Sequence, residues 1–405
     1  DRSDWIEIHN AGGETVDLAG WSLTDDIKNL AGWKLPAVKV EAAGFLLVFA
    51  SGKNRATAGE ELHADFKLGA GGEYLGLIKP DGRTVSHHYV MKYPKQRDDV
   101  SYGVPADWKP DADSATSVIG NTVFFLKPTP GAPNGSVLNG TVAKLAFSQP
   151  HGLYDEPFDL TISTETPGVT LRYTTDGSVP TIDSGTVLEG GLLKMEKTTV
   201  LRVAGFKPGF KPTKVVTRTY LFPKDIVRQS PDGLPPNGFP YEWGFNYVDY
   251  GMDQRVVNDK RYEDQIFDGL RSLPSYSLVM EMDDLFDEES GIFANAKNDG
   301  REWERSCSLE MISPDGESGF QENCGVRIRG GFSRMSPNAK HAFRFFFRSE
   351  YGPAKLQYPV FGKDAAQEFD NIDLRTFSNY SWSLSDDPRC TFMRDQFNRD
   401  MQFSL

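Results

Sequence analysis

Short alternating segments separated by glycine and proline dominate this sequence and restrict it to folds built from short strands. The 405 residues include 39 glycines and 25 prolines, and aromatic residues make up 12% of the chain. Glycine and proline interrupt regular structure, whereas aromatic residues favour strands. Long alanine- or leucine-rich blocks, which would indicate helices, are scarce. We therefore expect mostly β structure, and the length predicts two or three domains.

Charge and hydropathy argue against nucleic acid as the main partner and against a membrane-spanning segment. The net charge of −13 argues against nucleic acid as the main partner, because binding to a phosphate backbone requires a dominant basic surface. The longest apolar runs, such as Phe45–Ala50, are far shorter than the roughly 20 residues that a membrane-spanning helix needs. We therefore expect no membrane-spanning segment, although a local basic face remains able to bind a small anion.

The first region, residues 1–105, alternates short strand signals with turns and predicts a small β-sandwich. Three of its segments resemble a lamin-tail domain: Asp4–Asn10, Val16–Asp25 and Gly72–Leu77. That resemblance implies an immunoglobulin-like interaction module, with a role in binding or spacing rather than in catalysis.

A second sandwich is expected at residues 144–222, after a linker at 106–143 that is rich in proline, glycine, aspartate and asparagine. Asp176-Gly177 is a hairpin signal between two strands of this region. The run Arg172–Thr181 and the segment Thr217–Phe222 resemble the C-terminal β-sandwich of chitobiase/hexosaminidase-type enzymes. The resemblance implies an accessory domain without catalytic residues, of a kind found on secreted carbohydrate-active and surface proteins.

The third region, residues 271–405, follows a second linker at 223–270 and mixes strand and helix signals, so we expect an α+β domain. Its most informative part is a hairpin. Period two places Arg327 and Arg329 on one face of a strand and Val326 and Ile328 on the other. The returning strand, from 340 to 348, has two faces. One carries Lys340, Ala342, Arg344, Phe346 and Arg348, and the other carries His341, Phe343, Phe345 and Phe347.

Two interpretations of this hairpin remain open from spacing alone. It is either an amphipathic hairpin with a solvated basic face or a cradle for phosphate. The second is chemically reasonable because glycine amides, arginines and a lysine all suit phosphate oxygens, and Gly330 and Gly331 allow close backbone approach. The sequence contains no P-loop signature Gly-x-x-x-x-Gly-Lys-Ser/Thr, so that motif gives no support.

Further segments along the third region give the hairpin a family context. They follow the order found in CotH-like proteins, which are regarded as atypical protein kinases: Leu273–Leu278, Gly325–Arg334, Lys340–Arg344, Tyr351-Gly352, Tyr358–Phe361, Asp373–Arg375 and Arg394-Asp395. The resemblance implies that Lys340 is the nucleotide-binding lysine. It also implies that the turn carrying Gly330, Gly331, Ser333 and Arg334 lies close to phosphate, with ATP and Mg²⁺ as cofactors.

Phosphoryl transfer also requires acidic residues that hold magnesium and orient the acceptor. The family's acidic motifs lie further along than Leu405, so we expect this chain to be inactive alone, and its catalytic residues remain unknown. Five acidic residues could bind a hard cation, although a solvated acidic turn is the more ordinary interpretation: Asp283, Asp284, Asp287, Glu288 and Glu289.

Three cysteines are too few for a disulfide scaffold. Cys307 and Cys324 flank the turn signal Pro314–Glu317, and an even-length loop would set them opposite each other, in a geometry that permits a cross-strand disulfide. A three-residue loop with a bulge would place them on different faces instead. Cys390 is expected to be a buried small hydrophobe.

Two functions follow as hypotheses. The first is a secreted or cell-surface CotH-type kinase that transfers phosphate from ATP to protein hydroxyls. The second is a non-catalytic extracellular protein for adhesion or surface assembly, built of binding modules. In both, the partner is a protein substrate or surface protein, and the sandwiches are candidates for carbohydrate binding through aromatics such as Trp108 and Trp243.

Overall fold

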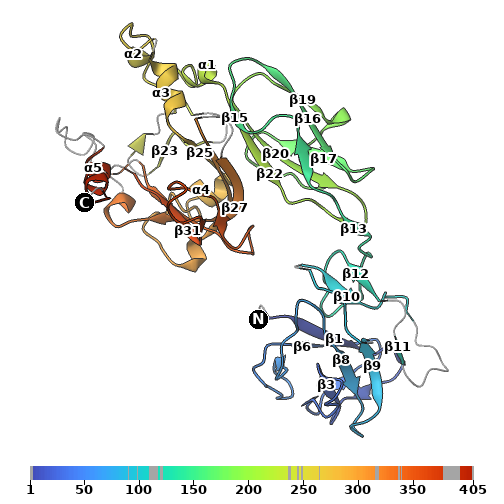
Figure 1. Cartoon of the computed structure of the whole chain (residues 1–405). Coiled ribbons are helices and arrows are strands. Elements are labelled where there is room, and N and C mark those ends of the chain that lie inside the picture. Colours follow the sequence, from blue (N-terminus) through green and yellow to red (C-terminus); the bar gives the residue numbers. More distant parts are fainter. Residues whose placement is uncertain are drawn as a thin grey trace. The chain divides into compact units, whose positions relative to one another are not determined.

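A computed structural model gives the structure, and it describes residues 3–89, 91–97, 99–108, 117–118, 122–235, 239–243, 246–247, 250–263, 265–314, 319–335, 338, 340–376 and 393–403. Strands make up 34% and helices 11% of the chain, in agreement with the expected β-rich composition. The chain divides into two units (Figure 1). The first comprises residues 1–141 with 207–211, and the second comprises residues 142–206 with 212–405.

The first unit contains two main sheets that enclose one apolar core. One sheet has the order β1-β6-β7, and the other has the order β11-β9-β8-β3-β4. Their bounds are β1 Trp5–His9, β3 Ser22–Thr24, β4 Trp33–Lys34, β6 Phe45–Phe49, β7 Leu62–His63, β8 Leu75–Ile78, β9 Val85–Tyr89 and β11 Ser117–Val118. Leu23, Trp33 and Val48 are buried in the core. This is the sandwich that the alternating segments predict.

Three two-stranded ladders complete the first unit. β2 (Val16–Asp17) pairs with β5 (Lys39–Val40), and β10 (Ser101–Gly103) pairs with β12 (Val123–Phe125). β13 (Gly140–Thr141) runs parallel to β21 (Phe210–Lys211). The residues expected to form a linker at 106–143 therefore also contribute strands to this unit, because isolated pairs of two or three residues give little sequence signal.

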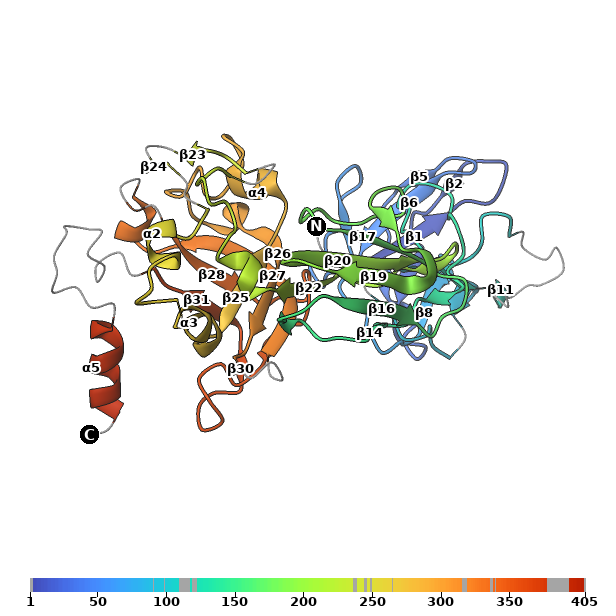
Figure 2. The same ribbon diagram turned by 90° about the horizontal axis from the view of Figure 1, so that it is seen from above.

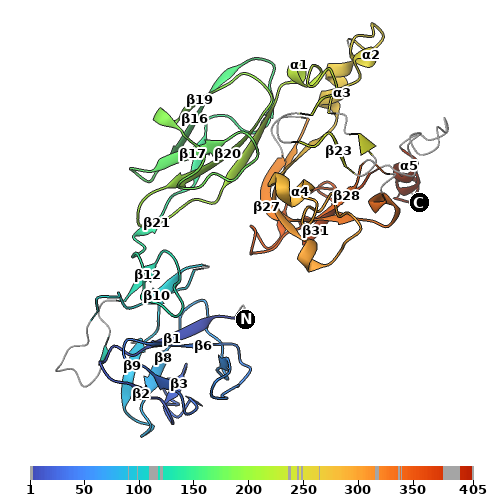
Figure 3. The same cartoon turned by 180° about the vertical axis from the view of Figure 1, so that it is seen from behind.

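The second unit begins with another sandwich, whose strands are visible in green in Figure 3. One sheet has the order β14-β16-β19, and the other has the order β15-β22-β20-β17-β18. Their bounds are β14 Leu145–Phe147, β15 Gly152–Leu153, β16 Phe158–Thr164, β17 Thr170–Thr174, β18 Thr186–Val187, β19 Leu192–Met195, β20 Thr199–Phe206 and β22 Val216–Leu221. A short 3-10 helix, η1 (Glu189–Gly191), directly precedes β19. Leu160, Leu201 and Tyr220 are fully buried between the sheets.

Short elements occupy the expected linker at 223–270. They are α1 (Pro223–Ile226), β23 (Glu242–Trp243), β24 (Asn246–Tyr247), α2 (Gln254–Val257) and α3 (Ile266–Ser272). Asp253 caps α2, because its side chain accepts a hydrogen bond from the Arg255 amide. No helix in the described ranges is both long and apolar enough to span a membrane.

A five-stranded antiparallel sheet forms the centre of the C-terminal region, with the order β25-β26-β27-β28-β31 (Figure 2). Its strands are β25 Ser275–Val279, β26 Arg305–Ile312, β27 Gly319–Arg329, β28 Ala342–Phe346 and β31 Asn371–Leu374. The other elements are α4 Met282–Phe286, η2 Arg301–Trp303, η3 Phe332–Arg334 and the pair β29 Leu356–Gln357 and β30 Glu368–Phe369. The mixture of sheet and short helices is α+β, as expected.

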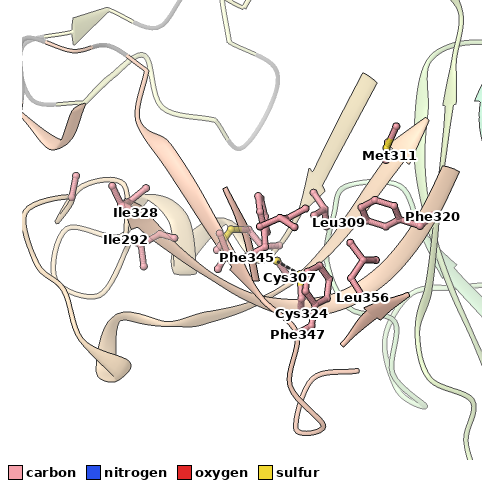
Figure 4. Packing of buried hydrophobic residues seen from close by; sticks show 14 residues of the cluster. Ile292, Cys307, Leu309, Met311, Phe320, Cys324, Ile328, Phe345, Phe347 and Leu356 are labelled. Atoms are coloured by element: carbon pink, nitrogen blue, oxygen red, sulfur yellow. Dashed lines mark hydrogen bonds between the residues drawn. The ribbon is translucent and has the colours of Figure 1, made fainter. Parts of the chain in front are cut away.

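One face of this sheet carries the core of the C-terminal region. Leu309, Val326 and Phe345 are completely buried there, and Ile292 packs beside Ile328 (Figure 4). On β27, the alternation of buried Val326 and Ile328 with the more exposed Arg327 and Arg329 confirms the period-two prediction.

The sequence also predicts a helix at residues 389–403, and the structure confirms its later part as α5 (Arg394–Phe403). Residues 377–392, which include Cys390, and the side chain of Asp395 lie outside the described part of the chain.

Within the second unit, polar contacts join the sandwich to the C-terminal sheet. The carboxylate of Glu310 on β26 is fully buried and accepts hydrogen bonds from the hydroxyl and the amide of Thr219 on β22. Asn323 on β27 donates to the carbonyl of Val215 at 3.2 Å. At another point, the Val179 amide donates to Oε1 of Glu281 at 2.9 Å.

Candidate functional site

The basic hairpin predicted from sequence is formed by β27 and β28. Their register places Arg329 opposite Ala342 and Arg327 opposite Arg344. Val326 and Ile328 are buried, while the arginines project from the other face of the sheet. The sheet therefore offers its arginine side chains to the surface and keeps its aliphatic residues in the core.

The turn after β27 depends on one glycine. Gly330 has a φ of 106°, which side-chain-bearing residues rarely adopt. A β-carbon there would lie 2.1 Å from Oγ of Ser333. That hydroxyl donates a hydrogen bond of 3.0 Å to the carbonyl of Arg329, which fixes the turn. At Gly331, in contrast, a β-carbon would meet nothing within 4 Å, and φ is −99°.

A cavity of about 190 Å³ opens at this turn. Its lining comes from the end of β27, the turn, the start of β28 and the two residues after β31: Arg329, Gly330, Gly331, Phe332, Ser333, Ala342, Arg375 and Thr376. Two arginines and a glycine turn in one cavity are groups that suit an oxyanion, because guanidinium and amide N–H groups donate to its oxygens.

Three of the five residues assigned from sequence line this cavity: Gly330, Gly331 and Ser333. The guanidinium of Arg334 instead donates to the carbonyls of Ile328, at 2.8 Å, and Asn298, at 3.2 Å. It therefore braces the turn. The side chain of Lys340 is exposed just before β28 and is not among the residues that line the cavity.

Arg329 and Arg375 were not assigned from sequence, although both line the cavity. Arg329 was recognised only as part of the basic face. Arg375 lies 45 positions after Gly330, and the pairing of β31 with β28 brings it near the turn. The one usable signal was its position directly after the strand that ends with Leu374.

Asp373 links the arginines beside the cavity. Its carboxylate lies 2.6 Å from Nε of Arg344 and 2.6 Å from Nε of Arg329, and Nη2 of Arg344 donates at 3.0 Å. Burial raises the pKa of Asp373, but the hydrogen bond from Arg344 and the nearby positive charges lower it below its ordinary value. Asp373 is therefore a fixed anion that holds two guanidinium groups in place.

Glu304 also holds guanidinium groups in place, further along the sheet. Its side chain is fully buried and lies 3.0 Å from Nε of Arg348, 3.3 Å from Nε of Arg327 and 3.3 Å from Nη1 of Arg301. The guanidinium of Arg327 also lies over the ring of Phe346, at 4.0 Å from its centroid. The basic face is thus an ordered ion-pair network, which differs from the solvated face that spacing alone allowed.

Tyr351 adds a phenol to the Glu304 network. Burial and the charge of Glu304 raise the pKa of Tyr351 to about 12, so that the phenol stays protonated at neutral pH.

The two cysteines lie directly opposite each other, Cys307 on β26 and Cys324 on β27. This is the register that an even-length loop produces. Their sulfurs are 3.6 Å apart and buried, so the pair is a contact between two thiols in this structure (Figure 4). A disulfide bond is about 2.05 Å long. The turn residues Asp315–Glu317 lie outside the described ranges.

The acidic cluster at 283–289 is engaged in local contacts. Asp287 accepts hydrogen bonds from the amides of Glu289 and Ser290, and Asp284 lies 3.5 Å from Arg305. In the described part of the chain, no group of three or more histidine, cysteine, aspartate or glutamate side chains is arranged to hold a metal ion. The side chains of Asp283, Asp287, Glu288 and Glu289 are exposed, as a solvated acidic turn requires.

Comparison with protein families identifies the two N-terminal sandwiches. Residues 1–92 match the Lamin Tail Domain model, and residues 149–217 match the model of the Chitobiase/beta-hexosaminidase C-terminal domain. No match to a CotH family model was found, and no curated protein matched the chain. The chain therefore carries a lamin tail domain followed by a chitobiase/β-hexosaminidase C-terminal domain.

Proposed function

We propose that the C-terminal region is a CotH-like kinase region and that the cavity at Gly330 binds phosphate groups of ATP. The observation that carries this proposal is the cavity itself, where a positive-φ glycine turn meets Arg329 and Arg375. Preorganised guanidinium groups and backbone amides are the donors that recur around transferred phosphoryl groups.

The donor set fits phosphate better than it fits magnesium. Arg329, Arg375 and the glycine turn would hold phosphate oxygens, while ATP would supply the transferable phosphoryl group. The described residues include no group of acidic side chains placed to bind a metal. The first step proposed is nucleotide binding, and the proposed reaction is phosphorylation of protein hydroxyls.

Isothermal titration with ATP tests this proposal, with Arg375→Gln as the variant. Loss of a charge-assisted contact should weaken ATP binding by about tenfold or more. Arg255→Gln is the matched control, because Arg255 lies on α2 and its side chain is 92% exposed. Tripolyphosphate should compete with ATP, whereas adenosine should not. ATP binding that is absent, or equal in Arg375→Gln and the control, would contradict the proposal.

The lysine assignment needs its own variant. By family resemblance Lys340 contacts the nucleotide, but in this structure it is exposed and outside the cavity lining. Lys340→Ala should weaken ATP binding if the lysine approaches the phosphates when nucleotide is bound. Unchanged affinity would remove Lys340 from the site and leave the arginine-lined cavity as the phosphate site.

A second candidate function is a secreted or cell-surface adhesion protein without catalysis. It is favoured by the two matched domains, which together precede the C-terminal region. Under this proposal the sandwiches bind a surface protein or a carbohydrate. Binding of the chain to intact cells, together with absence of ATP binding, would favour this candidate over the kinase.

A further inference from the structure

The sheet face beside the cavity carries more positive charge than its carboxylates neutralise. We call this surface the arginine face and define it by Arg301, Arg327, Arg329, Arg344 and Arg348. We propose that the arginine face binds an extended acidic peptide, which serves as the acceptor segment of the proposed kinase. Only the role of this peptide as the acceptor rests on the proposed function. Binding of the peptide can be tested independently of that function.

The arginine face is continuous with the cavity. Arg329 lines the cavity and also pairs with Asp373, and Asp373 lies directly opposite Arg344 on the neighbouring strand. Arg344 in turn lies opposite Arg327, which pairs with Glu304. A ligand along these strands would therefore run into the proposed phosphate site.

Like charges are placed against each other on this face. Arg327 and Arg344 are direct cross-strand partners, an arrangement that destabilises a sheet unless other groups offset it. The pKa of Arg327 is lowered, and burial is the largest cause. The charges of Arg348, Arg301 and Arg344 lower it further, whereas the charge of Glu304 raises it. A bound anion would relieve this repulsion.

The charges do not balance within the described residues. The five guanidinium groups of the arginine face meet three carboxylates, those of Glu304, Glu350 and Asp373. This local excess is opposite in sign to the net charge of −13 of the whole chain. Each of the five arginines pairs with Glu304 or Asp373, and their side chains are between 24% and 44% exposed. A ligand can therefore reach them.

The spacing favours a peptide over a single small anion. Arg327 and Arg329 are two residues apart on β27, so their α-carbons are separated by roughly 6.5 Å. Alternate side chains of an extended peptide repeat at the same interval, because both chains are strands. A peptide with several acidic residues can therefore meet several arginines at once. The ion pairs with Glu304 and Asp373 hold the guanidinium groups in place and reduce the ordering cost of binding.

Fluorescence polarisation with fluorescein-labelled hexaglutamate tests the arginine face. Arg344→Gln and Arg348→Gln should each weaken binding by about tenfold, as expected for loss of one charge-assisted contact. Arg255→Gln should bind like the unchanged chain. Hexaglutamine should not bind, and the affinity for hexaglutamate should fall with added salt. Circular dichroism of each variant establishes that the sheet is intact. If a glutamine variant does not fold, Arg344→Lys takes its place and should give a smaller loss.

Each outcome separates this inference from the proposed function. ATP binding without hexaglutamate binding would overturn the arginine face and leave the nucleotide site standing. Hexaglutamate binding that the arginine variants weaken, without ATP binding, would support the arginine face and contradict the kinase proposal. Equal affinity for hexaglutamate and for a DNA oligonucleotide of matched charge would overturn the assignment to a peptide.

Discussion

Nδ1 of His151 lies 2.7 Å from Oε1 of Glu310, so a residue of the second sandwich contacts a fully buried carboxylate on the C-terminal sheet. Thr219 donates to the same carboxylate through its hydroxyl, and Ser277 Oγ lies 2.8 Å from that hydroxyl. A buried carboxylate requires such partners, because an unsatisfied one costs several kcal/mol. The sandwich thus completes the polar interior beside β26.

Thr219→Val should therefore destabilise the second unit. The substitution preserves shape but leaves the Glu310 carboxylate without one donor, at a cost of about 1–3 kcal/mol. Denaturant unfolding of the whole chain measures the change. Thr161→Val is the matched control, because Thr161 is an exposed threonine on β16 of the same sandwich. Equal stability of the two variants would show that the Thr219 hydroxyl contributes nothing.

The first unit should lose stability in weak acid. Burial, and to a lesser extent the charge of His88, lowers the pKa of His87 to about 4, from the ordinary value of 6.5. Between these two pKa values the unfolded chain binds a proton at His87 that the folded chain does not. The contribution of neutral His87 to the free energy of unfolding is therefore fully present above about pH 6.5 and is lost as the pH falls towards 4. Between pH 7 and pH 5 the loss should be about 2 kcal/mol.

His87→Phe tests this assignment in thermal or denaturant unfolding at both pH values. It removes the titrating group, so the difference in stability between pH 7 and pH 5 should shrink by about 2 kcal/mol relative to the unchanged chain. His9→Asn serves as the control, because His9 is exposed. An undiminished pH dependence in His87→Phe would assign the acid sensitivity to other groups.

Gly330→Ala should disrupt the turn beside the cavity, whereas Gly331→Ala should be tolerated. The added carbon at 330 would overlap Ser333, and its φ of 106° is strained for alanine; at 331 the space is open. We expect Gly330→Ala to lose about 1–3 kcal/mol of stability and most ATP affinity. Unfolding and ATP titration of both variants give the comparison, and equal behaviour of the two would contradict it.

Cys307 and Cys324 should form an intramolecular disulfide under oxidising conditions. Directly opposed residues of antiparallel strands have α-carbon separations of about 4.5–5.5 Å, within the range that disulfides span. A disulfide reagent such as oxidised glutathione would accept the two electrons and protons as the S–S bond forms. In a Cys390→Ser chain, thiol titration after unfolding should show both thiols lost. When Cys307→Ser is added to the Cys390→Ser chain, one thiol is left, and it should remain free or form a mixed disulfide with glutathione.

Sequence patterns predicted those parts of the C-terminal region that depend on local periodicity. The alternation around Val326 and Arg327 assigned both faces of β27. For Cys307 and Cys324 the sequence left two loop lengths open, and the structure has the even-length one, which sets the cysteines opposite each other. Partners that arrive from distant strands were not predictable. Asp373 and Glu304 organise the arginines only because β31 and the start of β26 lie beside them, and no local pattern marks that proximity.

The site assignment shows the same limit. Gly330 was recognisable because a glycine pair between two strands indicates a turn that requires unusual dihedral angles. The side chain of Arg334 could not be placed, because its direction depends on the short η3 helix, which returns it to the carbonyl of Ile328. A basic residue in a turn can equally bind a ligand or the backbone of the turn.

The path of β22 determines where this protein can be divided for study. The family match ends at residue 217, but β22 continues to Leu221 and carries Thr219 and the buried Tyr220. A fragment that stopped at the match boundary would lack most of a central strand of its own sheet. A fragment that ends beyond α1 keeps the whole of β22. A C-terminal fragment that begins there, however, lacks the Thr219 hydroxyl that donates to the buried Glu310 carboxylate. The sandwich is therefore best ended beyond α1, and the C-terminal sheet is best produced together with the sandwich before it.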